Sequence, residues 1–248
     1  MEHVSPARRS GPARPGGLER EYAVTEARRP HVIAFDVMET LFPLTPLEWR
    51  FREAGVPRVL MHRWFAHVLR DAFALTAAGD YRPFGELARG ALQDITGHQV
   101  SESAVESIVQ ALASLDVRPD ADAAMRRIRD AEVRVVALTN SSEENTRSLL
   151  DRAGLTAHVE HVLSAAKPRR FKPAPEPYHY AAEVCEVDRD HMALVTAHAW
   201  DVHGAHRAGL VTGWSDHLEG RFSSVFAAPD VSGQGLVPVV SALLELPD

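Results

Sequence analysis

The chain has 248 residues, of which 45% are hydrophobic and 25% are charged. These values are typical of soluble globular proteins and exclude the collagen-like, disordered and disulfide-rich classes. The formal net charge of −7 gives no electrostatic reason to expect nucleic acid or a membrane surface as a partner. Cys185 is the only cysteine, which excludes an internal disulfide and a cysteine-based zinc site.

The N-terminal region has no features of a targeting segment. It lacks the apolar core of a secretory signal, and no stretch approaches the roughly 20 apolar residues that span a bilayer. Residues 1–30 are rich in Pro, Gly and Arg without apolar periodicity, which predicts a disordered tail. We therefore expect a cytoplasmic protein, and the sequence leaves a homodimer open.

The first structured segment is the apolar run HVIAFD at residues 31–36, which is typical of a strand buried on both faces. From residue 46 to residue 115 the apolar residues recur at helical spacing instead. Gly and Pro divide this region into predicted helices over 47–55, 58–80, 84–97 and 102–115. The pattern predicts a helical cap domain over 46–115, inserted into a core of residues 31–45 and 116–248.

Helices and strands alternate after the cap. Helices are predicted over 120–131, 141–154, 176–187 and 199–209, and strands over 133–140, 158–164, 191–197 and 210–215. Ser141 and Glu144 have capping-box spacing at the start of one of these helices. The alternation predicts an α/β fold with a doubly wound, Rossmann-like parallel sheet. Its ligand crevice would lie at the C-terminal strand ends, beneath the cap.

Polar residues stand at these predicted strand ends. They are Asp36, Thr139, Asn140, Lys172, Thr196, His198 and Asp201. Taken singly, each is typical of a turn or a helix cap. Because parallel strands bring their carboxyl ends to one edge, the set together predicts a functional site.

The motifs AFDVMETLF, ALTN, FKPAPEPY and VTAHAWD resemble, in order and spacing, those of the haloacid dehalogenase superfamily. The resemblance implies a catalytic set of Asp36 as nucleophile with Thr40, Thr139, Asn140, Lys172 and Asp201. An aspartate can attack carbon or phosphorus and form an ester or acyl-phosphate that water then cleaves. A neighbouring lysine keeps such a carboxylate ionised, and the helix after Asn140 can hold an anionic group at its N-terminus.

The residues within these motifs are most similar to those of the 2-haloacid dehalogenase (type II) branch. Phosphatases of the superfamily carry a second Asp where Met38 stands and a further acidic residue where Ala197 stands. Halide needs no proton on departure, and the branch uses no metal and keeps a tyrosine at the place of Tyr178. The resemblance thus implies a cofactor-free hydrolase that acts on a small anionic substrate through an ester of Asp36.

Several positions depart from that branch, which typically has an aromatic residue at Met38, Gly at Glu39 and Asn at His198. Its cap arginine, which assists halide departure, aligns with Phe65, leaving Arg63 or Arg70 as substitutes. One alternative is a magnesium-dependent phosphatase with His198 as proton donor and the metal on Asp36 and Asp201. A second alternative is a ligand-binding homologue without turnover.

The remaining interpretations concern the pocket. The substrate-binding candidates are Met38, Phe42, Phe65, Tyr178, Thr196, His198 and Trp200, and Trp49, Trp64 and Tyr81 are further cap aromatics. About two of the cap aromatics are expected to reach substrate, because most large residues at helical spacing form core. A histidine metal site is not favoured, because His203, His206 and His217 are expected to face water. Of the two lysines, Lys172 takes the catalytic position and Lys167 is expected at the surface.

Overall fold

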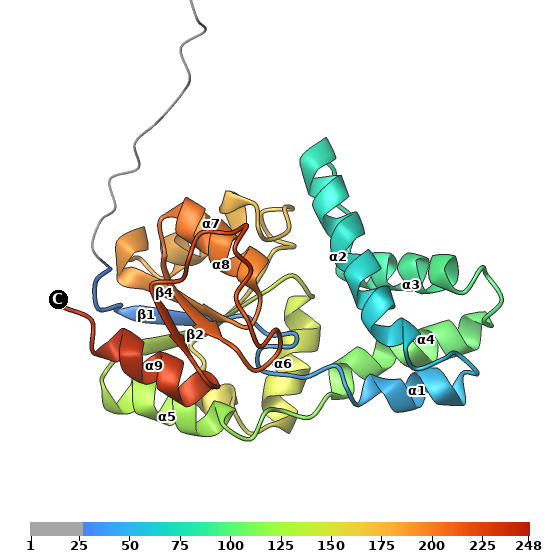
Figure 1. Ribbon diagram of the computed structural model, residues 1–248, viewed down its shortest axis with the longest axis horizontal. Helices are drawn as coiled ribbons and strands as arrows, with labels where there is room; N and C mark the ends of the chain where they lie inside the picture. Colours follow the sequence, from blue (N-terminus) through green and yellow to red (C-terminus); the bar gives the residue numbers. More distant parts are fainter. Residues whose placement is uncertain (1–26) are drawn as a thin grey trace, which may run out of the picture.

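The computed structural model describes residues 27–248 and has a six-stranded sheet at its centre (Figure 1). All adjacent strands pair in parallel, in the order β3-β2-β1-β4-β5-β6. The strands are β1 (Val32–Phe35), β2 (Arg134–Thr139), β3 (His161–Ser164), β4 (Met192–Thr196), β5 (Val211–Ser215) and β6 (Val231–Gly233). The chain winds outward from β1 in both directions, which confirms the doubly wound parallel sheet.

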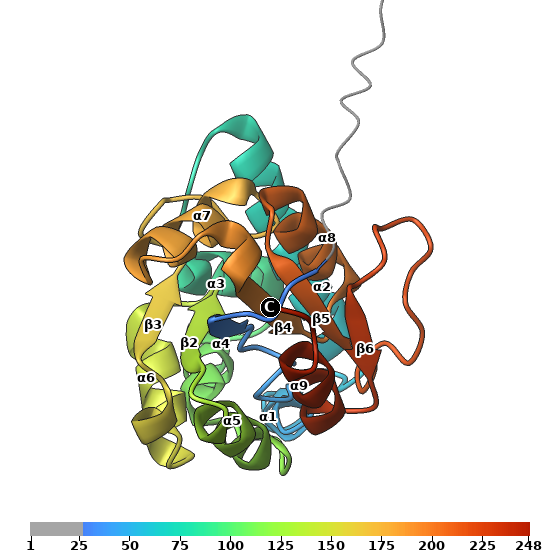
Figure 2. The ribbon, with the colours of Figure 1, turned by 90° about the vertical axis from the view of Figure 1, so that its left-hand side faces the viewer.

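Helices cover both faces of this sheet (Figure 2). On one face lie α5 (Ala121–Asp130), α6 (Glu143–Arg152) and α9 (Leu236–Leu244), and on the other lie α7 (Pro175–Val184) and α8 (Ala199–Ala208). Side chains alternate along β1. Ile33 and Phe35 pack with the residues of α5 and α9, whereas Val32 and Ala34 pack with those of α7 and α8. Burial on both faces explains the uninterrupted apolar run of the sequence.

Between β1 and α5 the chain forms helices that extend to one side of the sheet (Figure 1). These are α1 (Leu47–Glu53), α2 (Leu60–Ala78), α3 (Phe84–Ile95), α4 (Glu102–Gln110) and a 3₁₀ turn (Ala111–Ser114). Trp64 of α2 is fully buried, and its Nε1 donates to the Ala88 carbonyl at 2.8 Å. Trp64 therefore belongs to the core of this helical region and does not line a pocket. We call these helices the cap, and its status as a separate domain over 46–115 stays a proposal.

Two predictions of the alternating region need correction. The N-cap of α6 is Ser142, whose Oγ accepts from the Asn145 amide at 3.1 Å, so Ser141 does not begin a capping box. The sequence analysis also missed β6 and α9. The strand β6 has only three residues, none of them fully buried, and so presents no apolar run. The residues of α9 are apolar without a clear polar face, and helical periodicity is weak in such a segment.

The predicted tail over residues 1–30 lies mostly outside the described residues. Its last part is attached to the core, because the Arg29 amide donates to the Pro247 carbonyl at 2.7 Å. Ala27 packs against the apolar core as well. The tail boundary at residue 30 is therefore too late. Among residues 27–248, no helix has the length and apolar character needed to cross a membrane.

Candidate active site

Three buried charged groups meet at the C-terminal edge of the sheet. Lys172 Nζ donates to Asp36 Oδ1 at 2.8 Å, to Asp201 Oδ2 at 2.7 Å and to the Leu138 carbonyl at 3.0 Å. The side chains of Lys172 and Asp201 have no exposed surface, and that of Asp36 is 7% exposed. The compact ammonium thus has three acceptors and holds two carboxylates together.

The backbone around these groups fixes their positions. The Asp36 amide, directly after β1, donates to the Val195 carbonyl of β4 at 3.0 Å. Asn140, after β2, brackets the lysine: its Oδ1 accepts from the Lys172 amide at 2.8 Å and its Nδ2 donates to the Lys172 carbonyl at 3.2 Å. Asp201 lies in the first turn of α8. Three strand ends and one helix therefore set the geometry.

Electrostatics keeps the central pair charged. Burial alone would raise the pKa of Asp36, but the positive charges of Lys172 and His198, with hydrogen bonds from Lys172 and Thr40, hold it below the ordinary value of 3.8. Burial alone would lower the pKa of Lys172, but the carboxylates of Asp201 and Asp36 raise it above 10.5. Asp36 is therefore an ionised carboxylate at neutral pH, as a nucleophile requires.

The remaining carboxylate oxygens also have donors. Thr40 Oγ1 donates to Asp36 Oδ2 at 2.6 Å and accepts from the Ala197 amide at 3.0 Å. The Tyr178 hydroxyl donates to Asp201 Oδ1 at 2.6 Å. Burial and the Asp201 carboxylate raise the pKa of Tyr178 well above 10.0, so its phenol stays a neutral donor. All four oxygens of the two carboxylates are engaged by side chains of this chain.

This donor set does not fit magnesium. The ion prefers octahedral oxygen coordination, and Lys172 stands between the two carboxylates that the phosphatase alternative assigns to the metal. Ala197 supplies no further carboxylate at this edge. Within residues 27–248, the group of acidic and histidine side chains close enough to share an ion is Asp188, Asp190 and His191. These residues precede β4 and so lie at the other end of the sheet.

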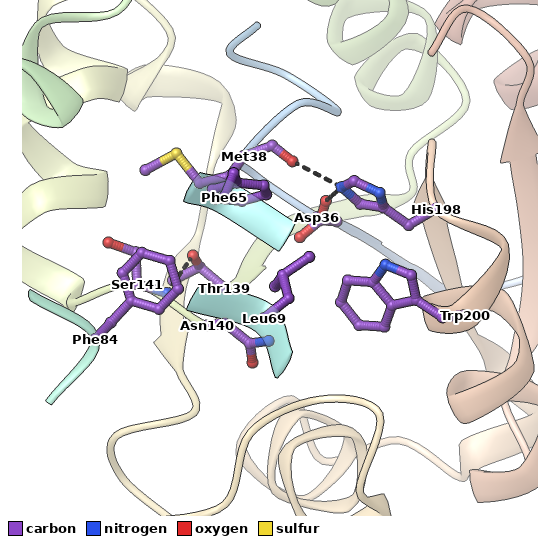
Figure 3. A pocket seen from close by; sticks show the side chains of 10 residues that line it. All are labelled: Asp36, Met38, Phe65, Leu69, Phe84, Thr139, Asn140, Ser141, His198 and Trp200. Atoms are coloured by element: carbon purple, nitrogen blue, oxygen red, sulfur yellow. Dashed lines mark hydrogen bonds and ion pairs between the residues drawn. The ribbon is translucent and has the colours of Figure 1, made fainter. Parts of the chain in front are cut away.

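A pocket opens in front of Asp36, between the core and the cap (Figure 3). It has a volume of about 280 Å³, part of it open to solvent. Its walls are Asp36, Met38, Phe65, Leu69, Phe84, Thr139, Asn140, Ser141, His198 and Trp200. The side chains from the cap, Phe65, Leu69 and Phe84, are all apolar. The polar groups come from the strand ends and from the segment that leads into α6.

The pocket brings together most of the predicted site residues. Thr40, Lys172, Tyr178 and Asp201 lie behind it and bond to Asp36 or to one another. Three substrate-binding predictions are wrong in placement, and Tyr178, which is fully buried with its hydroxyl on Asp201, is one of them. Phe42 is fully buried among core residues, and the Thr196 hydroxyl accepts from the His198 amide at 3.1 Å instead of lining the pocket.

The other cap candidates also lie elsewhere. Trp49 is 47% exposed, and Tyr81 stacks on Phe171 with ring centroids 4.9 Å apart. Neither proposed substitute for the cap arginine reaches the pocket. Arg63 is exposed, and the exposed Arg70 pairs with Asp71 at 2.8 Å. The cap wall of the pocket therefore carries no cation.

Three lining residues and one neighbour of the pocket were not among the residues predicted from the sequence. Leu69 lies four residues after Phe65 on the same helical face, and Ser141 continues the Thr139–Asn140 segment, so both had a detectable signal. Phe84 begins a different helix, and nothing in the sequence places it against α2. The neighbour is Glu39, whose carboxylate lies 3.8 Å from His198 Nε2.

Two further placements concern groups outside the pocket. Cys185 is buried in α7's C-terminal turn, and burial raises the pKa of its thiol to about 11, as expected of packing filler. His206 is exposed, as expected, but two other histidines expected to face water are half buried: His203, whose Nδ1 accepts from the Ala227 amide at 3.1 Å, and His217. Its Nε2 donates to the Glu39 carbonyl at 2.9 Å, so the expectation that it faces water is wrong.

Comparison with known proteins agrees with this geometry. Residues 30–209 match the family model of haloacid dehalogenase-like hydrolases. Haloacetate dehalogenase H-2 of Moraxella sp. is 26% identical over 220 residues, covering 86% of this chain and 96% of the relative. An (S)-2-haloacid dehalogenase of Xanthobacter autotrophicus is 27% identical over 183 residues, 72% of each chain.

A solved structure gives the same result for the fold. The L-2-haloacid dehalogenase from Xanthobacter autotrophicus superposes with a TM-score of 0.81 at 23% identity, covering 87% of this chain and 99% of that one. The family model spans most of the chain, from the residues before β1 to the end of α8. The chain belongs to the haloacid dehalogenase-like hydrolase family.

Proposed function

We propose that the protein is a metal-independent 2-haloacid dehalogenase that forms an ester on Asp36. The observation that carries the proposal is the absence of phosphatase carboxylates from the site: Met38 lines the pocket where a phosphatase has its proton-donating aspartate, and the buried Ala197 stands where it has a further acidic residue. The buried ammonium of Lys172 neutralises the two carboxylates that remain, Asp36 and Asp201. The names of the relatives, a haloacetate dehalogenase and (S)-2-haloacid dehalogenases, support the same substrate class.

In the first half-reaction, Asp36 attacks the carbon that bears the halogen. The substrate carboxylate is held at the start of α6, where Thr139, Asn140 and Ser141 line the pocket. The bond from carbon to halogen breaks as the bond from carbon to an Asp36 oxygen forms, so the carbon is inverted. Halide leaves as an anion, and Met38 in place of a proton-donating aspartate does not hinder this step.

In the second half-reaction, water attacks the carbonyl carbon of the Asp36 ester. Lys172 and Asp201 lie beside this group, and Lys172 stabilises the negative charge that develops on the carbonyl oxygen. The bond between the carbonyl carbon and the ester oxygen, which came from Asp36, breaks. That oxygen takes one proton of the water and leaves as the hydroxyl group of the hydroxy acid, and the second proton is released to solvent. Asp36 returns to its ionised state, which the neighbouring ammonium favours.

The pocket limits the size of the substrate. Three apolar cap side chains stand close in front of Asp36, which favours a short acid such as a 2-halopropionate over a longer one. The apolar cap wall also excludes water from the reacting carbon, which strengthens the electrostatic interactions within the site.

The test is halide release from 2-chloropropionate by the wild type and by Asp36→Asn, each with added magnesium and with chelator. We expect release by the wild type at one rate under both conditions and none by the variant. Phosphate release from small phosphoesters that requires magnesium would support the phosphatase alternative instead. Binding of 2-chloropropionate without any turnover would support the ligand-binding alternative.

A further inference from the structure

Glu39 adopts a backbone conformation that is unusual for its residue type. Its φ of 63° lies in the left-handed region, which favours glycine. Two hydrogen bonds hold it there: its amide donates to the Phe42 carbonyl at 2.9 Å, and its carbonyl accepts from His217 Nε2 at 2.9 Å. A strained residue that its surroundings hold in place next to a reactive carboxylate is a candidate for function.

The side chain of Glu39 meets that of His198 beside the nucleophile. Both are buried, with 11% and 7% exposure, and Glu39 Oε2 lies 3.8 Å from His198 Nε2. The same nitrogen lies 3.9 Å from Asp36 Oδ2 and 3.3 Å from the Met38 carbonyl (Figure 3). A carbonyl oxygen can only accept a hydrogen bond, so Nε2 carries the proton and donates it to the Met38 carbonyl, with the carboxylates of Asp36 and Glu39 within 4 Å of the same nitrogen.

Stacking contacts fix the orientation of the His198 ring, and two carboxylates lie beside it. His198 is the N-cap of α8, and its ring stacks on Trp200 with centroids 5.2 Å apart. Phe73 of α2 packs edge-on against Trp200 at 5.1 Å. The charged neighbours are the carboxylates of Asp36 and Glu39, with Lys172 on the far oxygen of Asp36.

Glu39 has further titratable neighbours. The pKa of Glu39 is affected by His62 of α2 and by Glu219 of the loop after β5, in addition to His198 and Asp36. Burial, with the negative charges of Asp36 and Glu219, raises the pKa of Glu39 above 4.5.

The opposite wall of the pocket has no comparable donor. The cap contributes Phe65, Leu69 and Phe84, and both Arg63 and Arg70 are exposed. A halide that leaves the substrate carbon attacked by Asp36 therefore meets no positively charged side chain from the cap. Among the lining residues, His198 is the ionisable donor that faces the nucleophile.

We propose that His198 and Glu39 act as a pair in which His198 Nε2–H donates to the departing halide and the Glu39 carboxylate, 3.8 Å from the same nitrogen, positions this donor. The inference rests on the proposed function and adds to it a preference for leaving atoms that accept hydrogen bonds strongly. In the attack step, the electron pair of the carbon–halogen bond goes to the halide. The proton stays on His198, and its hydrogen bond moves from the Met38 carbonyl to the halide.

Fluoride accepts hydrogen bonds more strongly than bromide and leaves carbon less readily, so its release depends more on such a donor. Single-turnover halide release is measured for 2-fluoro-, 2-chloro- and 2-bromopropionate with the wild type, His198→Asn and Glu39→Gln. His206→Asn, the same change at an exposed position of α8, is the matched control. We expect both site variants to slow fluoride release by roughly 10- to 100-fold more than bromide release, and the control to match the wild type.

Equal slowing of all three leaving groups would overturn the pair and leave the proposed dehalogenase intact. A wild type that releases no halide at all would instead contradict the proposed function. In that case fluoride binding decides the inference, read from tryptophan emission because Trp200 stacks on His198. Weaker fluoride binding by His198→Asn than by the wild type supports the donor, and equal binding overturns it.

Discussion

The two walls of the pocket differ in chemistry. The wall formed by the sheet edge carries Asp36, Asn140 and His198, with Lys172 and Asp201 behind it, and nearly every polar atom there has a defined partner. The wall formed by the cap consists of aromatic and aliphatic side chains. Under the proposed function, the sheet edge supplies the chemistry, whereas the cap supplies shape and excludes water.

This division has a physical reason. Strand ends of a parallel sheet are held by the backbone ladder on both sides, so their side chains keep the accurate geometry that catalysis requires. Helix α2 is held to the sheet edge by side-chain contacts such as Phe73 with Trp200 and by Thr76 Oγ1, which accepts from the Phe171 amide at 3.1 Å. Changes on the sheet side should therefore affect rate, and changes on the cap side should affect selectivity.

The largest effect is expected for Lys172→Arg. A planar guanidinium cannot replace a compact ammonium that bonds to Asp36, Asp201 and the Leu138 carbonyl with no exposed surface. We expect halide release to fall roughly 100- to 1,000-fold. Lys167→Arg, the same change at the exposed lysine, should leave the rate unchanged. An active Lys172→Arg would contradict the central place of this ammonium.

Tyr178→Phe should have a smaller effect because it removes one donor and leaves the charges in place. Asp201 Oδ1 would lose its 2.6 Å hydrogen bond in a site without water access. We expect unfolding to become easier by about 1–3 kcal/mol and turnover to fall about tenfold. Denaturant unfolding and initial rates measure the two effects. Tyr180→Phe, a half-buried tyrosine on the same helix, serves as the control and should show neither change.

Leu69→Ala tests the cap wall. Removing this side chain enlarges the pocket without touching the sheet edge. We expect kcat/KM for 2-chlorobutyrate to rise several-fold relative to 2-chloropropionate, since one methylene in an apolar pocket is worth about 1–3 kcal/mol. A loss of rate on both substrates with no change in their ratio would show that the cap does more than shape the pocket.

The smallest effect is expected for the dependence of ester formation on acidic pH. Because the pKa of Asp36 lies below 3.8, ester formation should stay nearly constant as the pH falls from neutrality toward about 5. The free energy of unfolding should also fall in acid. A carboxylate with a depressed pKa stabilises the fold at pH values above its ordinary pKa, and this stabilisation is lost as the pH falls through the pKa of Asp36 in the folded protein. Single-turnover halide release and acid unfolding measure both. Replacement of Lys172 by Met should move the acid limb of the rate to higher pH.

The sheet side of the molecule was readable from the sequence, because site residues follow apolar runs that end abruptly. Asp36 and Asn140 were found in this way, whereas Lys172 was found through the motif FKPAPEPY. The cap side was not, because Phe65 and Phe84 meet only through the packing of α2 on α3, which periodicity within one helix does not encode. Glu39 was noted only because it stands where the 2-haloacid dehalogenase branch typically has glycine. Its position beside His198 depends on a backbone conformation that a sequence pattern does not reveal.

In the proposed reaction, Asp36 supplies the oxygen atom of the product's hydroxyl group. One enzyme equivalent is mixed with substoichiometric 2-chloropropionate in heavy-oxygen water, and both the product and the Asp36 peptide are analysed by mass spectrometry. We predict unlabelled oxygen in the first 2-hydroxypropionate and heavy oxygen in the Asp36 carboxylate. Heavy oxygen in the first product with none in Asp36 would mean that water attacks the substrate directly, and would contradict the ester.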